Sequence, residues 1–381
     1  MPYLPSSCYN RYMTSSKYMQ IVEELRRDLH TSKPGERFLS EHQVAMRFDV
    51  SRPTASRALT ELCRDGLVER RVGSGTFVSD NPSADPRERL RSVGLLLSGL
   101  GSTEVWDPLA AQVNRVCSSL GLSLRMGPPS PPQDDVPFTR DQALDLIGQK
   151  INGVIFAPLE NVPDRERENR RICKMFTAAR IPVVLIDRDI VDFPKRSEFD
   201  VVGVDNVRGG AQLAEHLVSR GYRSPVYFSR PQHPSTTDQR VAGCAVTFLA
   251  HGVHVPAGWH VEGDPGDGEL VARLMADRSP DVVIAANDHT AARLIQTLAR
   301  LGHSVPQDVA VTGFDDTPFS ALLSVPLTTV RQSFEAIARA AVRTLFERIG
   351  EPEAAAREIL LPPQLVVRES TGGSGHGAAS A

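Results

Sequence analysis

The stretch SRPTASRALTELCRDGLVERRVGSGTFVS, residues 51–79, decides the fold of the N-terminal part of the chain. Its first half predicts a helix, because Ser51 is a good N-cap and Pro53 is tolerated in a first helical turn. On a helical wheel four apolar residues gather on one side: Ala55, Ala58, Leu59 and Leu62. The opposite side carries proline, hydroxyl and basic residues: Pro53, Ser56, Arg57, Thr60 and Arg64. The second half predicts a β-hairpin with a Gly-Ser-Gly tip.

Two further helices are predicted before this segment. The first has an apolar stripe with helical spacing, formed by Tyr18, Val22, Leu25 and Leu29. The second begins at Ser40, where SEHQ has the pattern of a capping box. Helices followed by a hairpin in this order predict a winged helix-turn-helix. Such a unit places one helix in the major groove of double-stranded DNA and its wing near the phosphates.

Residues 34–78 resemble the GntR-type winged helix without a gap. The resemblance implies that Arg52, Thr54 and Ser56 lie against DNA and that the wing tip approaches the minor groove or backbone. His42 stands where that family commonly has arginine, and Ser56 also stands at a position that is often arginine. The predicted DNA-binding residues are His42, Arg52, Pro53, Thr54, Ser56, Arg57, Arg71, Gly73 and Ser74.

From Ser92 to about Ser370, apolar strand-like runs alternate with amphipathic helical stretches. This alternation predicts an α/β fold of doubly wound parallel sheets covered by helices on both faces. Several runs end in a polar residue: Ser98, Asp187, Asp205, Ser229, Asn287 and Asp315. In such sheets the ligand crevice lies beyond the carboxyl ends of the strands. These polar groups therefore predict a site for one small, polyol-like molecule.

The larger part resembles the LacI/GalR effector-binding domain, a two-subdomain fold of the type I periplasmic-binding-protein kind, over about 275 residues. The matching signatures are VGVDNVRGGAQLAEHLVSRGYRSPVYFS, DQRVAG, VVIAANDHTAA and VTGFDDTPFSALLSVPLTTVRQSF. The resemblance implies an effector-binding set in one cleft: Ser98, Trp106, Asp187, Arg240, Asn287, Asp315 and Phe334. Within this set Trp106 is a candidate stacking platform for a sugar ring. Asp205-Asn206 favours a helix N-cap over a ligand contact, and Trp259 favours an edge or surface position.

The sequence divides the chain into five parts. We expect a disordered leader at 1–16, the winged helix-turn-helix at 17–79, a linker at 80–91, the effector-binding domain at 92–370 and a disordered tail at 371–381. Subdomain 1 is predicted to comprise 92–199 with 330–361, and subdomain 2 to comprise 200–329 with 362–370. LacI-type regulators have a hinge helix after the DNA-binding unit. The linker here carries prolines instead, so we do not expect the hinge-helix mechanism of those regulators in this chain.

The composition argues against several other classes of protein. Five cysteines without a CxxC pair favour reduced thiols over a disulfide framework or zinc site. No G-x-G-x-x-G follows the first strand of the larger part, and His251 and His254 lack a third ligand, so no cofactor and no metal site is predicted. The longest apolar runs are strand-length, and the N-terminus lacks a signal-peptide core. We therefore expect a cytoplasmic protein without a membrane partner. The net charge of −3 by itself favours no partner.

The combination of a GntR-type head and a LacI-type body resembles the arabinose repressor (AraR) group. The resemblance implies a homodimer, paired through the helices at 107–120 and 289–301, that reads a pseudo-palindromic operator and releases it when an effector closes the cleft. The predicted function is repression of a sugar or carbohydrate utilisation operon. The alternative is a solute-binding receptor without a DNA role, although that would need an export signal. An enzyme is disfavoured, because the five lysines occupy no strand-end cofactor motif and no nucleophile elbow is present.

Overall fold

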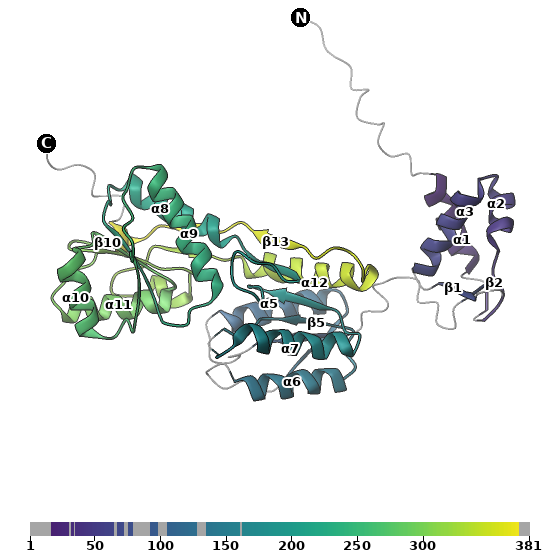
Figure 1. Ribbon diagram of the computed structural model, residues 1–381, viewed down its shortest axis with the longest axis horizontal. Helices are drawn as coiled ribbons and strands as arrows, with labels where there is room; N and C mark the ends of the chain where they lie inside the picture. The colour runs from purple at the N-terminus through teal and green to yellow at the C-terminus, as the bar shows by residue number, and fades with distance from the viewer. Residues whose placement is uncertain are drawn as a thin grey trace, which may run out of the picture. The chain divides into compact units, whose positions relative to one another are not determined.

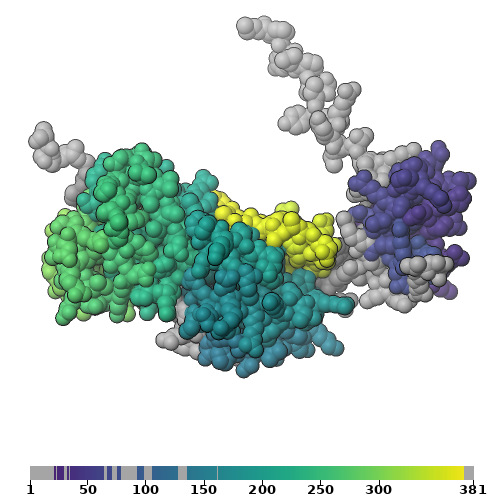
Figure 2. All heavy atoms as spheres, in the orientation of Figure 1, coloured from purple at the N-terminus to yellow at the C-terminus, as the bar shows by residue number. Residues whose placement is uncertain are grey.

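The computed structural model describes residues 17–29, 32–33, 35–64, 67–71, 75–78, 92–97, 105–127, 135–160 and 162–372. Contacts divide the chain into an N-terminal unit, residues 1–91 with 349–351, and a larger unit formed by residues 92–348 and 352–381. The predicted leader and linker, Ser98 and the wing-tip residues Gly73 and Ser74 lie outside the described residues. Figure 1 labels helices and strands of both units, and Figure 2 draws the heavy atoms of the chain as spheres.

The described residues of the N-terminal unit form three helices and a hairpin. Their bounds are α1 Lys17–Leu29, α2 Glu41–Phe48, α3 Arg52–Arg64, β1 Val68–Arg71 and β2 Gly75–Val78. The capping box is confirmed, because the Ser40 hydroxyl accepts from the Gln43 N–H while the Gln43 side chain accepts from the Ser40 N–H. The predicted apolar face of α3 is fully buried and packs against Val22, Leu25 and Leu29 of α1. This packing fixes which face of α3 remains outside.

The hairpin is extended by a third segment. Strands β1 and β2 pair antiparallel, with Val68 opposite Val78 and Arg71 opposite Gly75. The backbone N–H of Val78 donates to the carbonyl of Glu36 at 2.7 Å, and the Phe38 N–H donates to Thr76 at 2.8 Å. The residues just before α2 therefore cover the outer edge of β2. Anchoring both sides of β2 holds the wing on the helical core.

The larger unit begins with a six-stranded parallel sheet in the order β13-β7-β6-β5-β3-β4. The strands are β3 Ser92–Leu96, β4 Ser123–Met126, β5 Gly153–Phe156, β6 Val183–Ile186, β7 Asp200–Val204 and β13 Glu358–Leu361. The helices of this subdomain are α5 Trp106–Ser119, α6 Val136–Gly148, α7 Arg165–Ala178 and α12 Phe334–Gly350. One core joins alternate strand residues to α6 and α7, and the helix α12 packs on the strand β5 through Leu345.

A second, four-stranded parallel sheet has the order β11-β10-β8-β9. Its strands are β8 Pro225–Ser229, β9 His260–Glu262, β10 Val282–Ala285 and β11 Ala310–Thr312. The helices are α8 Asn206–Ser219, α9 Ser235–Ala250, α10 Gly268–Arg278 and α11 Asp288–Arg300, with a short 3-10 turn η1 Pro318–Ala321. Separate cores join one face to α8 and α9 and the other face to α10 and α11. Both sheets therefore have the predicted doubly wound architecture.

Three chain crossings join the subdomains. The first leads from β7 into α8, the second from β12 Thr329–Arg331 into α12, and the third from β13 into β14 Gln364–Val366, which pairs with β12. The predicted boundary at 199/200 lies before β7, yet β7 bonds to β6 and β13 of the first sheet. A buried strand followed by a helix N-cap is also the pattern expected at the start of a new subdomain. This is why the sequence placed the boundary before β7 and not after it. We therefore propose the first crossing at Asp205, and the other predicted domain limits stay predictions. A 3-10 turn η2 Glu369–Thr371 closes the described chain.

Trp259 was expected to be an edge or surface aromatic residue. It directly precedes the edge strand β9, but the expected surface position is wrong. The side chain is 8% exposed and belongs to the core shared by α8 and α9. It meets Tyr227 and Phe248 edge-on, with ring centroids 5.9 and 6.1 Å apart. The flanking Pro-Ala-Gly segment suggested a loop, but that loop folds inward over the end of α9.

Candidate functional sites: an exposed head helix and a polar cleft

Helix α3 presents its predicted polar face to solvent. Arg52, Pro53 and Arg57 are exposed, as is His42 on α2, whereas the apolar residues of α3 are buried. An exposed helix face with arginine side chains next to a hairpin fits the geometry by which winged helices read DNA. The backbone of Arg71 pairs with Gly75 at the end of β1. Contact of the predicted set with DNA stays a prediction.

Ser56 takes part in a small polar network on the same face. Its hydroxyl donates to Glu41 Oε1 at 2.7 Å, and Arg70 forms an ion pair with the same carboxylate oxygen at 2.9 Å. Ser56 is therefore half-buried and held in place by α2 and the wing strand. Thr54 is similarly tied to Ser51, with their hydroxyl oxygens 2.9 Å apart. These bonds connect the helix to the capping region and to β1.

Two of the predicted effector residues, Asp187 and Asp315, lie near Arg240 of α9. Its Nε donates to Asn206 Oδ1 at 2.8 Å, its Nη1 donates to the carbonyl of Ala286 at 2.7 Å, and its Nη2 lies 3.9 Å from Asp315 Oδ1. The guanidinium also stacks on the Phe314 ring, 3.6 Å from the centroid. Arg240 is only 7% exposed, and these contacts hold its guanidinium rigidly at the carboxyl ends of β10 and β11. A fixed guanidinium in this place can donate hydrogen bonds to a ligand.

Two carboxylates face this arginine from different subdomains. Asp187 follows β6 and Asp315 follows β11, and both have left-handed backbone angles, with φ of 73° and 111°. Burial raises the pKa of Asp187 to about 7, while Arg240 opposes the rise and Asp315 adds to it. Burial also raises the pKa of Asp315, against the opposing field of Arg240. Strained backbone and perturbed carboxyls at the ends of parallel strands are typical of a ligand site.

The first subdomain contributes a second arginine, which sequence reasoning missed. Arg188 donates to its neighbour Asp187, with Nη2 2.7 Å from Oδ2, and pairs with Glu160. Its guanidinium lies 5.3 Å from the ring centroid of Trp106, which is buried at the start of α5. Trp106 is thus connected to Asp187 through Arg188. The sequence signal was the polar triplet Asp187-Arg188-Asp189 directly after an apolar strand.

The remaining predicted residues take different positions. Asn287 caps α11, because its Oδ1 accepts from the Thr290 N–H at 2.9 Å, which leaves its amide nitrogen as the group it can offer a ligand. Phe334 is half-buried at the first position of α12. Asp205 caps α8, as expected, through the Arg208 N–H at 2.9 Å. The structure thus brings Asp187, Arg240 and Asp315 together. Asn287 lies next to them, because the carbonyl of the preceding residue, Ala286, accepts a hydrogen bond from Arg240.

Two further amides belong to this cluster: Asn206, which the sequence favoured as part of a helix N-cap, and Gln332, which the sequence did not single out. Asn206 accepts the hydrogen bond from Arg240, and Gln332 donates from Nε2 to Asp315 Oδ1 at 2.7 Å. Both are buried. Each lies at a subdomain crossing, where the chain leaves β7 and β12. Their roles depend on the tertiary arrangement and could not be inferred from strand-end spacing.

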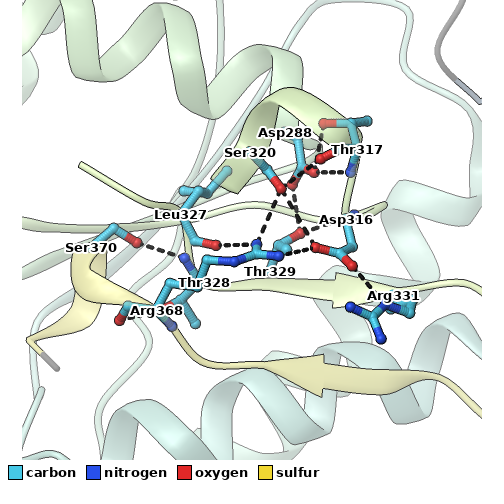
Figure 3. Close-up of polar contacts among 10 residues, drawn as sticks. All are labelled: Asp288, Asp316, Thr317, Ser320, Leu327, Thr328, Thr329, Arg331, Arg368 and Ser370. Atoms are coloured by element: carbon cyan, nitrogen blue, oxygen red, sulfur yellow. Dashed lines mark hydrogen bonds and ion pairs between the residues drawn. The ribbon is translucent and has the colours of Figure 1, made fainter. Parts of the chain in front are cut away.

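A polar network behind Asp315 fixes the loop that carries it (Figure 3). Asp288, fully buried, accepts from the Thr317 N–H at 2.7 Å and from the Thr329 hydroxyl. Asp316 is paired with Arg331 at 2.6 Å and with Arg368 at 2.5 Å. Arg368 also donates to the carbonyl of Leu327 at 2.8 Å. The network joins the loop after β11 to the C-terminal segment. It therefore keeps Asp315, which belongs to the same loop, in a fixed position.

Removing Arg368 should make the larger unit more sensitive to acid. Burial alone would raise the pKa of Asp316, but the bonds from Arg368 and Arg331 outweigh it and hold that pKa below its usual value. A carboxyl group whose pKa is lowered by folding stabilises the folded state at every pH above its unfolded-state pKa. This contribution is lost as the pH falls through the folded-state pKa. Arg368→Met should therefore lower the free energy of unfolding by about 1–3 kcal/mol at neutral pH and move acid unfolding to higher pH.

Urea unfolding at neutral and acidic pH, followed by circular dichroism, measures both effects. The matched control is Arg339→Met, which removes an exposed partner of Glu335 on α12. Such a surface pair contributes at most a few tenths of a kcal/mol, about 0.3–0.5. Equal losses in the two variants would contradict the assigned role of Arg368.

The two units define a class of protein: a DNA-binding transcriptional regulator with a ligand-binding body. Residues 17–78 match the model for bacterial regulatory proteins of the gntR family, and residues 214–371 match the periplasmic binding protein-like domain. The head is thus a GntR-type helix-turn-helix domain, and the body is a periplasmic binding protein-like domain.

Curated relatives share this architecture or its larger part. The chain is 25% identical over 370 residues to the arabinose metabolism transcriptional repressor of Geobacillus stearothermophilus, covering 94% of this chain and 98% of that one. It is 28% identical over 338 residues to the transcriptional regulator MalR of Streptomyces coelicolor, covering 86% of this chain and 95% of that one. The predicted combination of head and body is confirmed.

Solved structures have the same fold. A complex of the transcriptional regulator CelR with cellobiose superposes with a TM-score of 0.62 at 25% identity, covering 84% of this chain and 90% of that one. A LacI family regulator from Enterococcus faecium with bound ribose gives a TM-score of 0.58 at 20% identity, covering 74% and 98%. Within the described ranges, no helix combines the length and apolar character needed to cross a membrane.

Proposed function

We propose that this chain represses a sugar or carbohydrate utilisation operon and is released from its operator by a small sugar-like effector. The observation that carries the proposal is the cluster of Asp187, Arg240 and Asp315, in which two subdomains contribute opposite charges to one cleft. A hydroxyl group can donate to a carboxylate and accept from a guanidinium, so this set suits a polyol. The names of the relatives, a repressor of arabinose metabolism and a regulator bound to cellobiose, support the same class of ligand.

The proposed mechanism is closure of the subdomains around the effector. Asp187 belongs to the first subdomain, whereas Arg240 and Asp315 belong to the second. A ligand bonded to all three favours the closed arrangement, and it can weaken DNA binding only by the difference in its affinity for the two states. Typical coupling energies are about 1–3 kcal/mol. The candidate stacking residue Trp106 and the helix-start residue Phe334 are proposed to line the same cleft.

A homodimer is part of the proposal, with α5 and α11 as its interface. A shallow groove runs along α11 and η1 and is lined in part by apolar side chains, among them Ile295, Phe319 and Leu323. Two heads joined in this way would read the two halves of a pseudo-palindromic operator. Because that DNA lies in the cytoplasm, we propose that the protein acts there as a regulator and not as an enzyme. A solute receptor remains the second candidate, and the DNA assay below separates the two.

The proposal is tested with the full chain in two assays. A thermal-shift screen against sugars, sugar phosphates and purines identifies the effector. Fluorescence anisotropy with DNA from the chain's own promoter region then measures operator affinity with and without that effector. We expect salt-sensitive, sequence-specific binding that weakens when the effector is added. Effector binding without any specific DNA binding would favour the receptor.

A further inference from the structure

Three side chains with metal-ligating groups meet at the carboxyl end of the second sheet. His233 lies in the loop between β8 and α9, and His260 and Glu262 lie at the two ends of β9. One ligand atom from each residue can be chosen so that all three lie within 4.8 Å of one another. His233 Nε2 is already 3.4 Å from a Glu262 carboxylate oxygen. We infer that His233, His260 and Glu262 bind a divalent transition-metal ion, with Zn²⁺ the best match to this donor set.

The surroundings of His260 resemble the outer shell of a metal ligand. Ser229, fully buried at the end of β8, lies with its hydroxyl oxygen 2.8 Å from His260 Nε2. Tyr227 meets the imidazole edge-on, with ring centroids 5.3 Å apart. Because Nε2 is engaged by Ser229, Nδ1 is the ring nitrogen of His260 that can bind an ion, and metal-bound histidines are commonly held by such a bond to the other nitrogen.

A second carboxylate lies beside the group, on the other ring nitrogen of His233 from the one that faces Glu262. Asp238, in the first turn of α9, has a carboxylate oxygen 4.0 Å from His233 Nδ1. His233 and Glu262 lie near the protein surface, so an ion can enter from solvent and retain a water molecule. Two imidazoles and one carboxylate form a donor set that takes zinc and related ions with an open position. The cations Mg²⁺ and Ca²⁺ prefer sites made of oxygen alone.

The site also touches the junction between the subdomains. The carbonyl of His233 accepts a hydrogen bond from Arg165 Nη1 at 2.8 Å, and Arg165 begins α7 of the first subdomain. The same loop leads into α9, which carries Arg240. A bound ion would therefore hold the β8–α9 loop in one arrangement at the rim of the cleft. This second step, an effect of the metal on effector affinity, rests on the proposed function, whereas metal binding itself does not.

The test of metal binding uses the full chain, first freed of metal with a chelator. Titration with Zn²⁺ by calorimetry should give one saturable site per chain, and Co²⁺ should give visible bands of nitrogen and oxygen ligation. His233→Gln and Glu262→Gln should each weaken binding at least about tenfold. Glu262 is exposed, so its replacement keeps the fold intact. The matched control His251→Gln, at an exposed histidine, should bind like the unaltered chain.

Three results would overturn the inference. These are the absence of a one-to-one site, equal loss of binding in the control, and a sulfur-to-cobalt charge-transfer band, which would assign the ion to a cysteine. A further titration with the effector, with and without Zn²⁺, tests the link to the cleft. An unchanged effector affinity beside intact metal binding would reject the link alone, so failure of the metal site and failure of the proposed function remain distinguishable.

Discussion

Replacing Asp315 with asparagine is expected to abolish the response of the chain to its effector while leaving operator binding in place. Asp315 accepts a hydrogen bond from Gln332 and lies 3.9 Å from Arg240. Its carboxylate therefore offsets the positive charge of Arg240 and fixes the position of both neighbouring side chains. A hydrogen bond to a charged group contributes about 1.5–3 kcal/mol. Its loss should weaken effector binding roughly ten- to a hundredfold. Asparagine tolerates the left-handed backbone found at this position.

The measurement is the effector-induced rise in melting temperature, followed by operator affinity from fluorescence anisotropy. Arg240→Ala should lose the same response, because the guanidinium is the buried donor shared by the cleft. Asp277→Asn, at an exposed position of α10, is the matched control and should respond fully. If both cleft variants still respond to the effector, these residues do not form its site.

Arg52→Ala is expected to weaken operator binding by about 1–3 kcal/mol while the head remains folded. The side chain is exposed at the first position of α3, opposite the fully buried Ala55 and Leu59, so its removal leaves the core untouched. If Arg52 binds a phosphate, the slope of affinity against salt concentration should fall by about one. If it binds a base, the slope should persist and discrimination between operator variants should decrease.

Gel-shift or anisotropy titrations at several salt concentrations distinguish these outcomes. The matched control is Arg273→Ala, an exposed arginine on α10 of the larger unit, which should bind DNA like the unaltered chain. Unaltered DNA binding by Arg52→Ala would remove this residue from the contact surface. Circular dichroism confirms that the head is folded in both variants.

Much of the fold could be predicted because it depends on short-range patterns. The capping box at Ser40 and the buried stripe of α3 follow from residues three or four positions apart, and the structure contains both. The alternation of buried strands and helices likewise predicted doubly wound parallel sheets, and the resemblance to the LacI/GalR effector-binding domain implied two of them. Of the predicted cleft residues, Asp187 and Asp315 each follow a strand at the carboxyl edge of its own sheet, as strand-end spacing predicts. Their meeting with Arg240 of α9 depends on how the two subdomains face one another.

The remaining features depend on contacts between distant segments. The assignment of β7 to the first sheet is set by its partners β6 and β13, which lie before and far after it in the chain. Trp259 is buried because its loop folds over α9. The group of His233, His260 and Glu262 joins a loop to a separate strand. Sequence spacing cannot show such encounters, because each segment alone reads as an ordinary loop or strand end.

The central claim is that a ligand in the cleft and DNA on the head bind to one coupled molecule. The most direct measurement is the effector's dissociation constant for the full chain, determined by calorimetry with and without saturating operator DNA. Coupling is reciprocal, so the effector should bind more weakly to the DNA-bound chain by the same factor by which it weakens DNA binding. An effector affinity that is identical with and without operator would contradict the account.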